Sequence, residues 1–233
     1  MESVTAPSGT REDRSLENDD ALRAEVIKEL EWDPEVDAAH VGVAVTAGAV
    51  TLTGRVSSYP EKLAAVRAAE RVLGVRAVAD EIQVVLPGSR VHDDADLARL
   101  VAAELRRNAL VPDTVKAEVR GGVVTLRGEV EWFFQREEAE RAVQVIEGVT
   151  GITNDIRIKP PTKPTPEEVR RRVTEAFERA AAVDASNVSI LVDDGTIVLG
   201  GRVHSMYERA LAEEVARAAP GATEVVNEIV VDP

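Results

Sequence analysis

The stretch that decides the fold lies in the middle of the chain and reads Gly-Gly-Val-Val-Thr-Leu-Arg-Gly-Glu-Val over residues 121–130. It recurs 74 residues earlier as Gly-Ala-Val-Thr-Leu-Thr-Gly-Arg-Val over 48–56, and 73 residues later as Gly-Thr-Ile-Val-Leu-Gly-Gly-Arg-Val over 195–203. Apolar residues alternate with others in each copy, which is the period of a strand with one buried face. Because the same strand returns at one spacing, the sequence predicts three copies of a single unit.

Glycines and one isoleucine position keep the same spacing over the whole chain. The sets are Gly48, Gly122 and Gly195; Gly54, Gly128 and Gly201; Gly74, Gly148 and Gly221; and Ile82, Ile156 and Ile229. The first set is typical of hairpin turns, and the third of left-handed helix C-caps. The second set falls inside strands and predicts a bulge or a close helix crossing. A period near 74 exceeds the roughly 20–50 residues of solenoid repeats, so we expect tandem domains.

Each unit is predicted to begin with a helix, because apolar residues recur four apart in Leu22, Val26 and Leu30 and again at matching places later. Two strands, an alanine-rich second helix and a last strand follow. Thr165-Pro166 is a typical start for the helix of the third unit. The predicted class is α+β: three tandem α-β-β-α-β modules, each a small three-stranded sheet packed by two helices.

Composition and spacing place the boundaries of these modules. The first residues are polar and without apolar periodicity, which predicts a disordered tail, and the proline-rich run near residue 160 predicts an extended spacer. The expected divisions are a tail (1–19), repeat 1 (20–87), a linker (88–95), repeat 2 (96–159), a Pro-rich linker (160–165) and repeat 3 (166–233).

These motifs resemble a known family. The Val-Thr-Leu-x-Gly-x-Val strand and the closing Gly-Val-x-x-Val/Ile-x-Asn-x-Ile segment, which residues 148–156 match in full, are similar to the BON domain (bacterial osmotically inducible and nodulation). Asn227 stands at the place of Asn154, whereas repeat 1 has Asp80, whose carboxylate can make similar turn hydrogen bonds. The resemblance covers about residues 20–233. It implies a non-enzymatic α/β module linked to osmotic and envelope stress, with members thought to bind phospholipid.

The candidate contact residues lie where the second strand leads into the second helix. Three of the seven aromatic residues are consecutive here, and the aligned positions of the other repeats hold further large side chains. The set is Trp132, Phe133, Phe134, Tyr59, Met206 and Tyr207. Consecutive residues cannot all face one core, so an exposed patch for lipid, a partner or a neighbouring repeat is one interpretation. Packing of the rings into the local core or onto a linker is the other.

Composition excludes several function classes. The chain has no cysteine, so disulfides, thiolate metal sites and cysteine nucleophiles are absent. A formal charge of −14 argues against nucleic-acid binding. No apolar run is long enough for a transmembrane helix, and the three histidines show no metal-binding spacing. We therefore expect no cofactor and no metal.

The start of the sequence has no basic region followed by an apolar run, so a cytoplasmic protein is expected, or a periplasmic one if a leader has been trimmed.

Two functional hypotheses remain open at this point. The first is a stress-associated binding or scaffold protein that contacts phospholipid through repeat 2, which carries the smallest net negative charge of the three. The second is a regulatory module that binds an ion or a protein partner, with the aromatic residues buried between repeats. An enzyme ranks last, because no convergent set of acid, base and nucleophile is visible.

Overall fold

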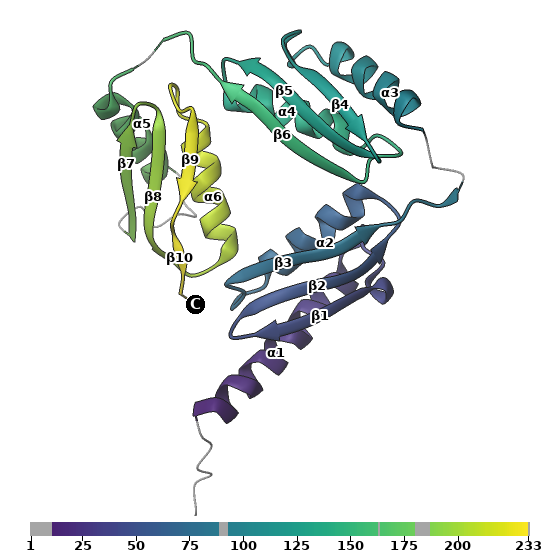
Figure 1. Ribbon diagram of the computed structural model, residues 1–233. Coiled ribbons are helices and arrows are strands. Elements are labelled where there is room, and N and C mark those ends of the chain that lie inside the picture. The colour runs from purple at the N-terminus through teal and green to yellow at the C-terminus, as the bar shows by residue number, and fades with distance from the viewer. Residues whose placement is uncertain (1–10, 89–92, 163, 180–186, 233) are drawn as a thin grey trace, which may run out of the picture.

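The computed structural model describes residues 11–88, 93–162, 164–179 and 187–232, and it contains three α-β-β-α-β units in succession (Figure 1). Repeat 1 comprises α1 (Arg11–Trp32), the short 3-10 turn η1 (Ala38–His40), β1 (Val41–Thr46), β2 (Ala49–Val56), α2 (Tyr59–Arg71) and β3 (Ala77–Val84). Repeat 2 comprises α3 (Asp94–Arg107), β4 (Lys116–Arg120), β5 (Val123–Val130), α4 (Phe133–Gln144) and β6 (Gly151–Ile158). Repeat 3 comprises α5 (Pro166–Arg179), β7 (Val188–Asp193), β8 (Thr196–Val203), α6 (Met206–Arg217), β9 (Glu224–Asn227) and β10 (Val230–Val231). The predicted fold class is confirmed.

The stretch that repeats in the sequence forms the central strand of each sheet. β2 pairs antiparallel with β1 and parallel with β3, and β5 has the same two kinds of neighbour in β4 and β6. In repeat 3 the last strand is in two pieces, β9 and β10, and both pieces lie parallel to β8. Between them the amide of Glu228 donates to the carbonyl of Leu199 at 2.7 Å, so the chain stays attached to β8 across the interruption.

The apolar stripes of the first helices supply much of each core. Val26 and Leu30 are fully buried against the inward-facing Val50 and Leu52 of β2. The corresponding stripes are buried in the other repeats: Leu97, Val101 and Leu105, then Val169, Val173 and Phe177. The four-residue spacing in the sequence therefore identified the buried face correctly.

All three hairpin turns have positive φ at both central positions, as the turn glycines predicted: Ala47 and Gly48, Gly121 and Gly122, Asp194 and Gly195. In repeats 1 and 2 an aspartate of the first helix also holds the turn. Asp94 accepts hydrogen bonds from the amides of Gly121 and Gly122 at 2.8 and 3.1 Å. Asp19 does the same for Ala47 and Gly48 at 2.7 and 3.1 Å. The first helix and the hairpin of these repeats are thus joined directly.

The glycines inside the second strands have a different cause from the one expected. Gly128 has a φ of 149° and faces neither a bulge nor a helix. A Cβ at this position would lie 2.5 Å from the carbonyl oxygen of Thr114, which precedes the first strand of the repeat. Gly54 and Gly201 face His40 and Asn187 in the same way. The strand glycine is therefore required by a close approach of two backbones.

The glycines after the second helices also differ from prediction. Gly74 has a φ of 98°, but α2 ends three residues earlier at Arg71. An extra turn intervenes, in which the amide of Val75 donates to the carbonyl of Val72 at 3.2 Å. Gly148 and Gly221 likewise come after α4 and α6 have ended. These glycines turn the chain toward the last strand and do not cap the helix directly.

Two helices begin before the expected starts of their repeats. Residues 11–19 of the expected tail form the first turns of α1. This stretch is rich in Arg, Glu and Leu, which favour helices, and Asp19 is hydrogen-bonded to the hairpin. Residues 1–10 of the expected tail lie outside the described part of the chain. The first helix of repeat 2 begins at Asp94, inside the expected linker, because Asp93 caps it by accepting from the amide of Asp96 at 2.7 Å.

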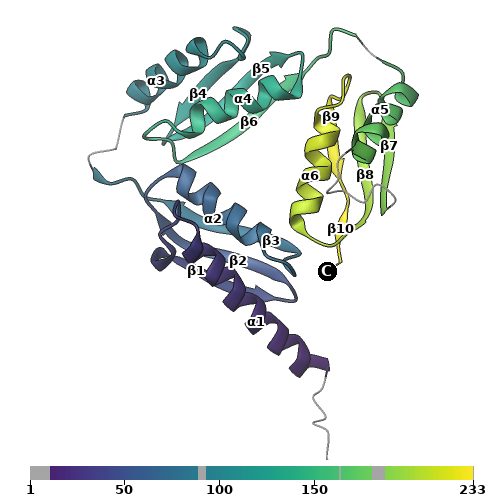
Figure 2. The ribbon, with the colours of Figure 1, turned by 180° about the vertical axis from the view of Figure 1, so that it is seen from behind.

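The three repeats surround a common centre. Both views place α2, α4 and α6 on the inner side of the assembly and the first helices α1, α3 and α5 on the outer side (Figure 1, Figure 2). The second helices therefore face the junctions between repeats.

In the described part of the chain, no helix is both long and apolar enough to cross a bilayer.

Replacing Gly128 by Ala should destabilise the protein by roughly 2–4 kcal/mol, because the new Cβ meets the Thr114 carbonyl and the positive φ strains any L-residue. Thermal or urea unfolding measures the change. Gly151→Ala is the matched control in the same sheet, since its Cβ would meet only Val123 at 3.6 Å, an ordinary contact. Equal stability of the two variants would contradict the close-approach explanation.

Candidate contact surface at the start of the second helices

The start of the second helix is built in one way in repeats 1 and 3 and in another way in repeat 2. Ser58 and Ser205 are N-caps whose hydroxyls accept from the amides of Glu61 and Glu208 at 3.3 and 3.1 Å. In repeat 2 the N-cap is Trp132, whose side chain cannot accept such a bond. Serine at an N-cap is worth about 1 kcal/mol over an apolar residue. The indole therefore occupies a position where a small polar residue would favour the helix.

Gln135 stabilises this unusual helix start from the other side. Its side-chain oxygen accepts from the amides of Trp132 and Glu131 at 3.1 and 2.9 Å. Two backbone donors that precede the helix are thereby satisfied without a capping hydroxyl. The helix can begin at Phe133 although its N-cap residue is aromatic.

The consecutive aromatic residues point to different environments. Phe133 is only 6% exposed, Trp132 is partly buried and Phe134 is 48% exposed. In repeat 3, Met206 is partly buried whereas the next residue, Tyr207, is 57% exposed. The first residue of each second helix is thus turned inward, and the second residue of α4 and α6 is left on the surface.

Tyr59, the first residue of α2, joins repeat 1 to repeat 2. It packs against the core of repeat 2 and bonds the backbone of Ile152 in β6. Burial raises the pKa of its phenol above the ordinary value, and the nearby carboxylates Glu140 and Asp80 raise it further, while the bond to Ile152 acts in the opposite sense. A cavity of about 270 Å³ lies beside this contact, lined by 57–60, Leu86 and 145–149.

Repeat 2 is joined to repeat 3 through one continuous apolar cluster. The buried residues of both repeats belong to it, and Phe133, the first residue of α4, is among them. An ion pair crosses the same junction, with Arg217 Nη1 3.6 Å from Glu137 Oε1. The side chains of this pair are partly shielded from solvent.

Met206, the first residue of α6, joins repeat 3 to repeat 1. Its side chain packs against the core of repeat 1 as well as that of its own repeat, and α6 contacts α2 directly. Glu70 of α2 lies at this junction near Arg209 of α6. Burial raises the pKa of Glu70, and the attraction of Arg209 and Arg67 offsets part of that rise.

The position that Asn154 occupies in the closing strand fastens the second helix to its own sheet. Asn154 donates to the carbonyl of Arg136 at 3.1 Å and to Glu140 at 2.9 Å, and Asn227 makes the matching bonds in repeat 3. In repeat 1, Asp80 pairs instead with Lys62 at 3.0 Å and accepts from the amide of Ile82 at 3.0 Å. The interpretation that Asp80 replaces the turn bond of asparagine is correct.

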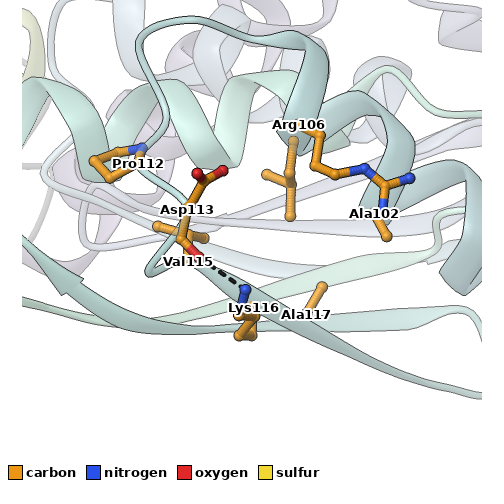
Figure 3. A pocket seen from close by; sticks show the side chains of 8 residues that line it. Ala102, Arg106, Pro112, Asp113, Val115, Lys116 and Ala117 are labelled. Carbon is orange, nitrogen blue, oxygen red and sulfur yellow. Dashed lines mark hydrogen bonds between the residues drawn. The ribbon is translucent and has the colours of Figure 1, made fainter.

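A surface hollow of repeat 2 is lined in part by charged side chains. One cavity of about 300 Å³ lies between α3 and the approach to β4 (Figure 3). Its charged lining residues are Arg106, Asp113 and Lys116, and Lys116 donates to the main-chain carbonyl of Asp113 at 2.8 Å. Among the described residues, no group of three or more His, Asp or Glu side chains is placed to hold a metal ion.

A family model describes this architecture. The BON domain matches three times, over residues 18–85, 93–160 and 166–233. The chain belongs to the BON domain family. Its three BON domains follow one another in tandem, as the sequence predicted.

Osmotically-inducible protein Y of Escherichia coli strain K12 is a relative of this BON protein. The two are 31% identical over 147 residues, which is 61% of this chain and 73% of the relative. Two structures of CdsD, a structural protein of the type III secretion system of Chlamydia trachomatis, match at 16% and 15% identity. They cover 91% of this chain and 98% and 93% of their own. At a TM-score of 0.25, neither likeness supports a conclusion.

The pKa of Tyr59 should lie above about 10, the ordinary tyrosine value, because burial between the first two BON domains disfavours the phenolate. With a raised pKa in the folded state, the stabilisation is complete below pH 10 and is lost as the pH rises through the raised value. Tyrosinate absorbance of the Tyr207→Phe variant, in which Tyr59 is the remaining tyrosine, measures the midpoint. A midpoint at or below 10 would contradict the buried position of Tyr59.

Proposed function

We propose that this BON protein is a non-enzymatic binding or scaffold protein of the osmotic stress response, and that it contacts phospholipid through repeat 2. The observation that carries the proposal is the pair Trp132 and Phe134 at the start of α4. Phe134 is half exposed, and Trp132 occupies an N-cap position that serine fills in the other two repeats. Kinship with an osmotically inducible protein supports the stress association.

The physical basis of this contact is apolar and not electrostatic. A chain with a charge of −14 is repelled by anionic lipid, so binding has to come from side chains that enter the interface. Indole and phenyl rings suit the boundary between head groups and acyl chains. Fully burying one large apolar side chain contributes about 1.5–3 kcal/mol. Two such side chains yield weak binding, which is compatible with reversible contact.

A second candidate is a scaffold that binds a protein partner. The observation in its favour is that Tyr59 and Met206 lie in contacts between repeats and that Phe133 is buried, which leaves fewer large apolar side chains for a membrane. In this case Phe134 and Tyr207, both about half exposed, would form part of a protein contact. Vesicles would then leave the environment of Trp132 unchanged.

Flotation with phosphatidylcholine vesicles, with and without phosphatidylglycerol, tests the lipid contact. We expect the wild type to float and Trp132→Ser/Phe134→Ala to lose at least tenfold in binding, since both side chains leave the interface. The serine restores the N-cap of the other repeats, so the variant should fold at least as well.

Tryptophan fluorescence tests the same contact. In the background Trp32→Phe, which removes the other tryptophan, 83% exposed, vesicles should shift the emission of Trp132 to the blue.

Leu191→Ala is the matched control, because Leu191 is a large apolar residue, 69% exposed, on β7 of repeat 3. This variant should float like the wild type. If no lipid mixture binds the wild type at low salt, or if Leu191→Ala loses as much binding as the double variant, the phospholipid contact through repeat 2 is refuted.

A further inference from the structure

The three junctions between repeats are successive steps of one head-to-tail ring. At two of them the first residue of a second helix belongs to the contact, because Tyr59 reaches repeat 2 and Met206 reaches repeat 1. Repeats 2 and 3 share one apolar cluster, and Arg217 of α6 pairs with Glu137 of α4 across their junction. The order 1 to 2, 2 to 3 and 3 to 1 closes on itself, and Figure 2 shows the second helices facing inward around the centre. A head-to-tail contact whose rotation closes produces a ring.

The junctions differ in how they are held. Between repeats 1 and 2, Tyr59 combines a partly buried ring with a hydrogen bond from the backbone of Ile152. Both junctions of repeat 3 bring opposite charges together, namely Arg217 with Glu137 on one side and Arg209 with Glu70 on the other. The charged groups near Tyr59, Glu140 and Asp80, are both negative and therefore do not attract each other. The apolar contact toward repeat 1 is Met206, a flexible side chain that specifies a packing arrangement poorly.

The residue near the end of the second helix also differs in charge between the repeats. Glu70 of repeat 1 and Arg217 of repeat 3 occupy one position of the repeat, and the corresponding residue of repeat 2 is the neutral Gln144. The side of repeat 2 that faces repeat 1 therefore presents an amide where the other two junctions present a charge. At this position a charged residue, Glu70 or Arg217, therefore stands only at the two junctions that hold repeat 3.

We propose that repeat 3 is a salt-sensitive unit that undocks from a stable pair of repeats 1 and 2 when ionic strength rises. Glu70 is partly buried, and Arg209 compensates for its lost hydration; Arg217 and Glu137 are likewise only partly exposed. Salt weakens both attractions while the desolvation of Glu70 remains. The contact between repeats 1 and 2, through Tyr59, is not weakened in this way. The ring thereby responds to the ionic change that accompanies osmotic stress.

The size of the response is modest. Partly exposed ion pairs are screened as the Debye length falls from about 10 Å at 0.1 M to about 3 Å at 1 M salt. The Arg217–Glu137 pair, together with the attraction between Arg209 and Glu70, changes the constant of the closing equilibrium severalfold, up to roughly tenfold. A ring that is closed by a small margin at low salt will therefore be open in a measurable fraction of molecules at high salt.

Distances between spin labels test this device in the full chain. Because the protein has no cysteine, labels can be placed freely. The exposed Gln83 and Ser189 report on repeats 1 and 3, and Gln83 with the exposed Arg120 reports on repeats 1 and 2. We expect both pairs to have one narrow distance at about 0.1 M NaCl. At about 1 M, the first pair should gain a second, longer distance while the second pair stays unchanged.

Removing the charges identifies the cause. Glu70→Gln/Arg217→Gln should abolish the salt dependence of the Gln83–Ser189 distance, since both junctions then resemble the neutral position of repeat 2. Arg171→Gln is the matched control, because Arg171 pairs at 2.7 Å with Glu175 on the outer helix α5. It should respond to salt like the wild type. A distance that is broad at low salt, one that ignores salt, or a response that persists in the double variant would each overturn the proposal.

Discussion

The small size of the repeats is the constraint on which the structure depends. Each is a sheet of three strands, the last of them in two pieces in repeat 3, with two helices, and a core of this size is small. The first residue of the second helix is large and apolar in every repeat. Phe133 is buried in the cluster of repeats 2 and 3, whereas Tyr59 and Met206 are partly buried and pack against the core of another repeat. Burying these side chains requires a neighbour. Domain number and domain arrangement are thereby linked through one position of the repeat.

Within each repeat, the backbone imposes a second constraint. The chain approaches itself so closely at the second strand that only glycine fits at Gly54, Gly128 and Gly201. The hairpin turns require positive φ at both central residues, and Asp19 and Asp94 fasten two of these turns to the first helix. These local requirements recur at one spacing, which explains why three repeats keep their glycines although their surfaces differ. The surface is free to change in charge and in aromatic content.

The difference between the repeats is concentrated at the start and the end of the second helix. Repeat 2 has Trp132 where its neighbours have a capping serine, and Gln144 where they have a charged residue. The proposed binding function of repeat 2 and the proposed salt-sensitive attachment of repeat 3 therefore both rest on variation along one helix. The first concerns what the chain touches, and the second concerns when its three BON domains stay together.

The sequence by itself determined the class, the number of repeats, the buried stripes of the first helices and the turn glycines, because these follow from local periodicity and backbone geometry. It also singled out residues 132–134 and their counterparts as unusual. Only the tertiary structure decided which of them face inward, because Tyr59 and Met206 are buried by other repeats and no local pattern encodes that contact. The reason for the strand glycines was equally hidden, since the carbonyl of Thr114 that Gly128 approaches is brought there by the fold.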